Sequence, residues 1–151
     1  MGKVKVSDKL LLSVEKPARY TGGELNSIVK ETARLRFALC FPDVYEIGMS
    51  HLGSRILYEV INSREEYACE RCFAPWPDME KAMRENNVPM FTLETRTPLA
   101  ECDIVGFSLL YEMCYTNILT MLDLAHIHKR SADRGENEPI IVAGGGCACN
   151  P

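Results

Sequence analysis

The segment LRFALCF, residues 35–41, is followed directly by PDVYEIG, residues 42–48, and these two segments decide how the rest of the chain is interpreted. Apolar residues run almost without interruption from Arg36 to Phe41, which is typical of a strand buried on both faces of a parallel sheet. Pro42 ends the run. The following loop therefore stands at the carboxyl end of a central strand, where open α/β sheets place their ligands.

Strands and helices are predicted to alternate along the rest of the chain. We expect strands at residues 68–73, 90–94 (MFTLE), 102–110 and 139–146, the last one buried, and helices at residues 8–14, 51–63, 78–86 and 112–128. Ser50 is the expected N-cap of the helix over 51–63, and Ile118, Leu119, Leu122 and Ala125 are expected to face inward. This alternation predicts an α/β fold: a doubly wound, Rossmann-like, mostly parallel sheet with helices on both faces.

Composition restricts the class of protein. The chain has 151 residues, enough for one domain, with 46% hydrophobic and 25% charged residues. No apolar run approaches the roughly 20 residues of a membrane span, and the amino terminus has no secretory pattern, so a cytoplasmic location is expected. The net charge of -4 gives no basic field for nucleic acid, which favours small-molecule or protein partners.

The domain organisation is predicted from the first and last elements. Residues 1–34 are interpreted as an N-terminal extension, and residues 35–151 as the α/β domain. The sequence predicts no helix after its last strand, so we expect a fragment truncated at the C-terminus of the domain.

Three loops are expected to meet at the carboxyl edge of the sheet: PDVYEIGMSHLG, SLLYE and GGGCACNP, which begin at Pro42, Ser108 and Gly144. Glycine lets a ligand approach the backbone closely, and a serine at a strand end can donate a hydrogen bond without bulk. Taken singly, each glycine is equally well explained by a tight turn.

The first loop resembles the Asp-x-His-x-x-Gly motif of cobalamin-binding domains, with Tyr45 where the histidine would stand. In that family a serine like Ser108 of VGFS contacts the nucleotide tail of the cofactor, and a glycine pair like Gly144 and Gly145 follows the next strand. The segments KPARYTGGE, FAPWPDME, TNILTMLDLA and VAGGGCACNP resemble, more specifically, the N-terminal part of B12-binding-type radical SAM proteins of unknown substrate.

This resemblance implies that a radical SAM domain follows and is the partner of this one. The [4Fe-4S] cluster and S-adenosylmethionine would belong to that domain only, because this chain lacks Cys-x-x-x-Cys-x-x-Cys: Glu65 stands where a first cysteine would precede Cys69 and Cys72. The chain is therefore not expected to be catalytic alone.

If a corrinoid binds, the base-off form without a histidine lower ligand is expected, because a phenol with a pKa of about 10 is a poor neutral ligand for cobalt. Tyr45 would then lie under the ring or cap the cobalt face at a distance. The resemblance and the three loops together predict a ligand edge built from Asp43, Tyr45, Glu46, Gly48, Ser50, His51, Ser108, Tyr111, Glu112, Gly144, Gly145 and Gly146.

The histidines and cysteines of the chain can also be explained by structural roles without any ligand. His51 is expected to open a helix, and His126 and His128 to interact with a helix dipole. The pair in CERC, Cys69 and Cys72, would face opposite ways on a strand, and a structural zinc site needs four ligands. The last two of the chain's seven cysteines, Cys147 and Cys149, offer only two thiols near the ligand edge, and Cys40, Cys102 and Cys114 are expected in the core.

The sequence leaves three alternatives to corrinoid binding open. A phospho-acceptor receiver domain needs an aspartate where Ser108 stands, and a flavodoxin needs an anion-binding loop without the two acids of DVYEIG. The strongest alternative is a module that binds no corrinoid and instead holds substrate or docks onto the radical SAM domain, for which Trp76, Tyr111 and Tyr115 are candidate contacts.

Overall fold

The structure is a computed structural model, and it describes residues 2–149. Its sheet contains β1 (Leu35–Phe41), β2 (Tyr67–Phe73), β3 (Ile104–Ser108) and β4 (Ile140–Gly144). The α-helices are α1 (Asp8–Leu11), α2 (Tyr45–Ser50), α3 (Leu52–Asn62), α4 (Pro77–Glu85), α5 (Tyr115–Leu124) and α6 (Gly146–Cys149). Short 3-10 helices are η1 (Pro17–Tyr20), η2 (Leu99–Glu101), η3 (Glu112–Cys114) and η4 (Ser131–Asp133).

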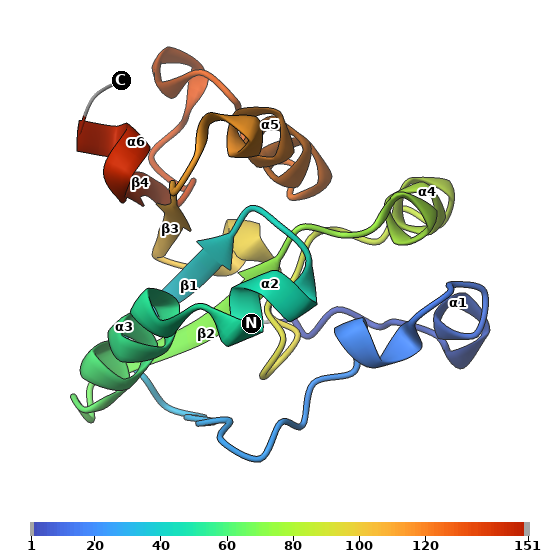
Figure 1. The fold of residues 1–151 in the computed structure, drawn as a ribbon, viewed down its shortest axis with the longest axis horizontal. Helices are drawn as coiled ribbons and strands as arrows, with labels where there is room; N and C mark the ends of the chain where they lie inside the picture. The colour runs from blue at the N-terminus through green and yellow to red at the C-terminus, as the bar shows by residue number, and fades with distance from the viewer. Residues whose placement is uncertain (1, 150–151) are drawn as a thin grey trace.

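The four strands pair in parallel in the order β2-β1-β3-β4 (Figure 1). The chain moves from β1 to β2 on one side and then crosses back to β3 on the other side of β1. The strand order therefore reverses between β1 and β3, and this switch point is where an open α/β sheet forms its ligand crevice. The predicted fold class is confirmed.

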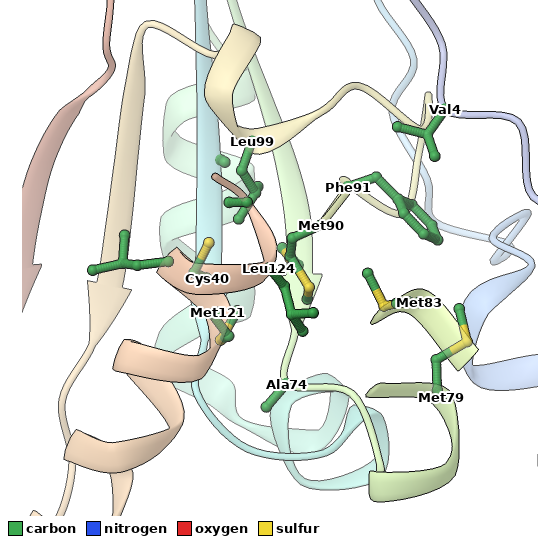
Figure 2. Close-up of a cluster of buried hydrophobic side chains, with 14 of the residues drawn as sticks. Val4, Cys40, Ala74, Met79, Met83, Met90, Phe91, Leu99, Met121 and Leu124 are labelled. Atoms are coloured by element: carbon green, nitrogen blue, oxygen red, sulfur yellow. The ribbon is translucent and has the colours of Figure 1, made fainter. Parts of the chain in front are cut away.

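Helices cover both faces of the sheet. On one face, Tyr58 of α3 packs with Leu39 of β1 and Cys69 of β2. The opposite face carries a larger core rich in methionine, to which α4 contributes Met79 and Met83, α5 contributes Met121, and β1 and β3 contribute further side chains (Figure 2). Cys69 and Cys72 belong to different cores, which confirms that they face opposite ways.

The N-terminal residues contribute to the larger core. Val4, Val6 and Leu10 are buried there, and Val4 lies near Phe91 (Figure 2). The Val4 N–H also donates to the Arg96 carbonyl at 2.8 Å. These residues therefore pack with the α/β domain, and the division at residue 34 stays a prediction. Within residues 2–149 no helix is both long and apolar enough to cross a membrane.

Several local predictions are wrong. Residues 45–50 form α2 instead of a loop, and His51 instead of Ser50 caps α3. The predicted strand over residues 90–94 is reduced to one antiparallel bridge between Phe91 and Pro98, because the segment turns at once instead of extending beside a neighbour. Leu119 of α5 is exposed, since the helix lies over the sheet with only part of its apolar surface facing inward.

The prediction of a long helix over residues 112–128 is also wrong in detail, because α5 ends at Leu124 and His126 adopts a positive φ of 58°. His128 lies beyond the helix and pairs with Glu138 at 2.7 Å, instead of interacting with a helix dipole. Ile141 packs against the core, but Ile140 and Val142 of β4 are 64% and 41% exposed. The predicted buried strand is thus a half-covered edge strand, and α6 follows it.

Candidate functional site at the switch point

A direct contact across the switch point joins the loop after β1 to the loop after β3. The Tyr111 hydroxyl donates to Asp43 Oδ2, although the two residues are 68 positions apart in the sequence. This hydrogen bond to a carboxylate is the main cause that raises the pKa of Tyr111 above its ordinary value. Asn117 of α5 adds a second link, because its Nδ2 donates to the Pro42 carbonyl at 2.9 Å.

Beside this contact lies a cavity of about 340 Å³ between α3 and strands β1, β3 and β4. We call it the switch-point cavity. Residues from all three predicted loops and from the elements between them line it: Phe37, Leu39, His51, Gly53, Leu57, Gly106, Phe107, Ser108, Leu110, Val142, Ala143, Gly144 and Gly145. Its walls are mainly apolar, and Ser108 and His51 supply polar side chains, a composition typical of small-molecule sites.

Two glycines have a steric role around this cavity. A Cβ on Gly106 would lie 2.4 Å from Cζ of Phe37, so only glycine lets this ring cross β3. Gly145 has a φ of +119°, and a Cβ there would lie 2.3 Å from the Leu109 carbonyl oxygen. The glycine turn is held against the end of β3, because the Leu109 N–H donates to the Gly144 carbonyl at 2.6 Å.

His51 combines a capping role with a place in the cavity wall. Its Nδ1 accepts the Ser54 N–H at 3.1 Å and lies 2.9 Å from Ser54 Oγ, and its ring packs on Phe41. Because Nδ1 is an acceptor here, the neutral ring carries its proton on Nε2. His51 therefore offers a ligand an N–H donor, and it has no free lone pair for a metal while it caps α3.

The structure separates four of the predicted ligand residues from this cavity. The Tyr45 hydroxyl donates to Glu24 at 3.1 Å, and Glu46 forms ion pairs with Arg19 and Lys16. Gly48 is buried beneath Phe73, and the Ser50 hydroxyl donates to the Ile47 carbonyl within α2; none of these four lines the cavity. The physical reason is α2, because a helix distributes successive side chains around its axis and residues 45–50 therefore cannot all face the cavity.

Two further predicted ligand residues lie at the margin. Glu112 is exposed in η3, and Gly146 is exposed at the start of α6. Asp43 and Tyr111 lie at the switch point but do not belong to the cavity lining, which leaves His51, Ser108, Gly144 and Gly145 on its wall. The last residues of the third predicted loop, Asn150 and Pro151, lie outside the described residues.

The thiols do not form a metal centre in the part of the chain that the structure describes. There, no group of three or more His, Cys, Asp or Glu residues could hold a metal ion. Five cysteines are buried, Cys147 is half-buried and Cys149 is exposed. Desolvation raises the pKa of Cys69 and of Cys102 to about 12, so both are protonated at neutral pH. A [4Fe-4S] cluster, which needs thiolate ligands, does not fit this arrangement.

Sequence reasoning missed the residues that give the cavity its shape. Phe37 and Gly106 lie inside strands, Leu57 lies in a helix and Val142 lies on the edge strand. The isolated glycine of VGFS is the one signal that could have indicated a close approach, because glycine inside a strand often marks one.

These features define an open α/β module with a ligand-sized cavity at its switch point. A comparison with protein-family models finds that the family described as radical SAM proteins, N-terminal, matches residues 53–151, and the chain belongs to this family. The match begins at Gly53, the last residue of the first predicted loop. No curated protein and no solved structure matches the chain. Family membership confirms the radical SAM part of the resemblance and implies a [4Fe-4S] cluster and S-adenosylmethionine in the full protein.

Proposed function

We propose that this module binds a corrinoid in the base-off form and holds the nucleotide tail of the corrinoid in the switch-point cavity, for use by the radical SAM domain of the same protein. The observation that supports this most directly is the convergence of Ser108, Gly144 and Gly145 on one cavity wall. Ser108 matches the serine that contacts the nucleotide tail in cobalamin-binding domains, and Gly144 and Gly145 match the glycine pair that follows the next strand there.

The cavity has suitable chemistry for the heteroaromatic base of such a tail. Phe37 and Leu57 supply apolar surface, whereas the Ser108 hydroxyl and the Nε2–H of His51 supply hydrogen-bond groups. The absence of side chains on Gly144 and Gly145 lets a ligand approach the backbone of β4. These residues would bind and orient the tail, and α3 would shield it from water.

The proposal specifies a base-off corrinoid because a tail held in the switch-point cavity is removed from cobalt. No histidine ligand replaces it, since Tyr45 stands at the histidine position of the motif and Nδ1 of His51 caps α3. Desolvation, together with the hydrogen bond to Glu24, raises the pKa of Tyr45, so its phenol stays protonated and directed at a carboxylate. A bound corrinoid would supply methyl-transfer or redox chemistry at cobalt. This chain would supply its binding and orientation.

The proposal is tested by titrating the chain with hydroxocobalamin and, separately, with a cobinamide, which lacks the nucleotide tail. We expect cobalamin to be retained with a base-off absorption spectrum, and cobinamide to bind at least about tenfold more weakly, which corresponds to about 1.4 kcal/mol. Equal binding of both, or no retention of cobalamin, would contradict the proposal.

A matched pair of variants locates the binding. Leu57→Trp fills the switch-point cavity from α3 and should abolish the preference for cobalamin. Val60→Trp is the control, because it places the same side chain at another exposed position of the same helix that does not line this cavity. If both variants bind cobalamin like the parent chain, the tail lies elsewhere.

A second candidate function, docking onto the radical SAM domain without a corrinoid, is favoured by the exposed apolar side chains of α3 and β4. Ile56 and Val60 of α3 are exposed, as are Ile140 and Val142 of β4. Such a surface is typical of an interdomain contact. Val60→Ser and Ile140→Ser should then weaken association with the separately expressed radical SAM domain, measured by calorimetry, and leave the cobalamin titration unchanged. Unaltered association would contradict docking through this face.

A further inference from the structure

A second cavity, of about 300 Å³, lies on the other flank of α3 from Leu57 and close to β2. We call it the Arg71 cavity. Its lining comes from the segment before β1, from α2, from α3 and from both neighbouring strands: Asn26, Leu39, Phe41, Gly48, Met49, Leu52, Ser54, Arg55, Ile56, Tyr58, Glu59, Val60, Arg71 and Phe73. It is as large as a small ligand site, and its walls are mainly apolar and aromatic.

The buried cation in this lining is Arg71 of β2, which is only 6% exposed. Its Nε donates to Glu94 at 2.6 Å, Nη2 donates to Ser27 at 3.0 Å, and the guanidinium lies 4.5 Å from the ring centre of Tyr58. A guanidinium this buried needs good partners for its N–H groups, because an unmade hydrogen bond is costly away from water.

The remaining nitrogen, Nη1, has only poor partners. Its contacts are Asn26 Oδ1 at 3.5 Å and the thioether sulfur of Met49 at 3.4 Å. A good N–H···O bond is about 2.9 Å long, and a thioether is a weak acceptor. Both of these partners line the cavity, so Nη1 lies where an oxygen of a bound molecule could replace them.

The charges around Arg71 indicate whether the oxygen that Nη1 could bind is neutral or anionic. Glu94 pairs with the guanidinium, and Glu24 lies 3.9 Å from Nη2, so one buried cation already has two carboxylates beside it. A further anion would be repelled, whereas a neutral acceptor meets no such penalty. Arg55 and Glu59 on the wall have opposite charges and add no net charge.

We infer that the Arg71 cavity binds a small, neutral, mainly apolar molecule that carries a carbonyl-type oxygen, and that Nη1 of Arg71 donates to this oxygen. The aromatic and aliphatic walls, including Phe41, Phe73 and Ile56, bury its apolar body. This site is independent of the proposed corrinoid site, because it lies on the other flank of α3 and shares only Leu39 with the switch-point cavity.

The test compares three probes with the same ring and different charge: acetophenone, benzoate and benzylammonium. Each is titrated into the 151-residue chain while the methyl resonances of Met49, Ile56 and Val60 are followed by NMR. We expect acetophenone to shift these resonances saturably and to give intermolecular contacts to them. Benzoate and benzylammonium should bind roughly tenfold more weakly, as expected when charge is added beside a compensated ion pair.

The two tryptophan variants separate this inference from the corrinoid proposal. Val60→Trp fills the Arg71 cavity and should abolish the acetophenone shifts while the preference for cobalamin over cobinamide persists. Leu57→Trp should abolish that preference and leave the acetophenone shifts unchanged. No saturable shift with acetophenone, equal binding of benzoate, or acetophenone binding that survives in Val60→Trp would each overturn the inference. Thermal unfolding of both variants confirms that they fold.

Discussion

Glu70 of β2 is the best position at which to test how buried charge holds this fold together. It is 1% exposed, and one of its carboxylate oxygens pairs with the Arg36 guanidinium of β1. The other oxygen accepts hydrogen bonds from Thr92 and from Thr95, the latter at 2.6 Å. Glu70 thus connects the edge strand β2 and the central strand β1 to the turn that precedes η2.

Glu70→Ala should cost about 3–5 kcal/mol, because it leaves a buried cation without its ion partner. Arg36 is 7% exposed, and its other acceptor is the Lys30 carbonyl at 3.3 Å. Once the Glu70 carboxylate is removed, neither water nor another protein group can therefore replace it well as the partner of Arg36. Domains of this size have about 5–15 kcal/mol of stability in total. With a urea dependence of about 2 kcal/mol per molar, the unfolding midpoint should fall by roughly 2 M.

The assay is urea unfolding followed by circular dichroism, on Glu70→Ala, Arg36→Ala and the double variant. We expect a coupling energy of about 2 kcal/mol or more, because the double variant removes both charges. Glu80→Ala is the control, since Glu80 pairs with Arg84 on the surface of α4 and should cost less than about 1 kcal/mol. If Glu70→Ala is too unstable to fold, Glu70→Gln keeps the shape and allows measurement. A cost below about 1 kcal/mol, or no coupling, would show that the buried Glu70–Arg36 pair contributes little to stability.

Three further predictions concern the switch point, the thiols and the last loop. Tyr111→Phe removes the hydrogen bond to Asp43 and should lower the unfolding free energy by about 1 kcal/mol, measured by calorimetry. It should also weaken cobalamin binding in the hydroxocobalamin titration. If neither value changes, Tyr111 does not join the two loops. A thiol reagent should modify Cys149 first and the five buried cysteines only as the chain unfolds, so rapid modification of all thiols in the native chain would be evidence against the described core. Hydrogen bonds from the backbone N–H and the ring of His128 and from the Gly135 N–H lower the pKa of Glu138 to about 2. These bonds should stabilise the loop at pH values above the ordinary pKa of a glutamate, and the stabilisation should be lost as the pH falls from about 4 to about 2. A carboxyl resonance of Glu138 that titrates normally would contradict this.

Much of the architecture is predictable because it is encoded locally. The unbroken apolar run of β1 and the helical spacing in α3 depend on residues close together in the sequence, and both elements are within a residue or two of the prediction. The end of α5 and the conformation of residues 45–50 are not predictable in the same way, because backbone hydrogen bonding near helix ends depends on what each segment packs against.

The burial of β4 shows a second limit. PIIVAGGG has the apolar content of an interior strand, and the sequence alone cannot indicate that Val142 lies on the half of the face that α3 leaves open. The N-terminal residues show the converse. Val4 and Val6 have no strong pattern of their own, yet they are buried because the large core has space for them.

The fold class and the positions of the three loops at the carboxyl edge can be predicted from local patterns, because strand and helix periodicities are properties of the chain. The radical SAM family is indicated separately, by the resemblance of the quoted motifs. Which residues meet at that edge depends on tertiary contacts. It joins Asp43 to Tyr111 across the switch point, places Ser108 and Gly145 on one cavity, and turns Tyr45 toward Glu24. The physical reason is that a side chain's direction depends on the turn of its own helix and on neighbours distant in sequence, neither of which a motif records.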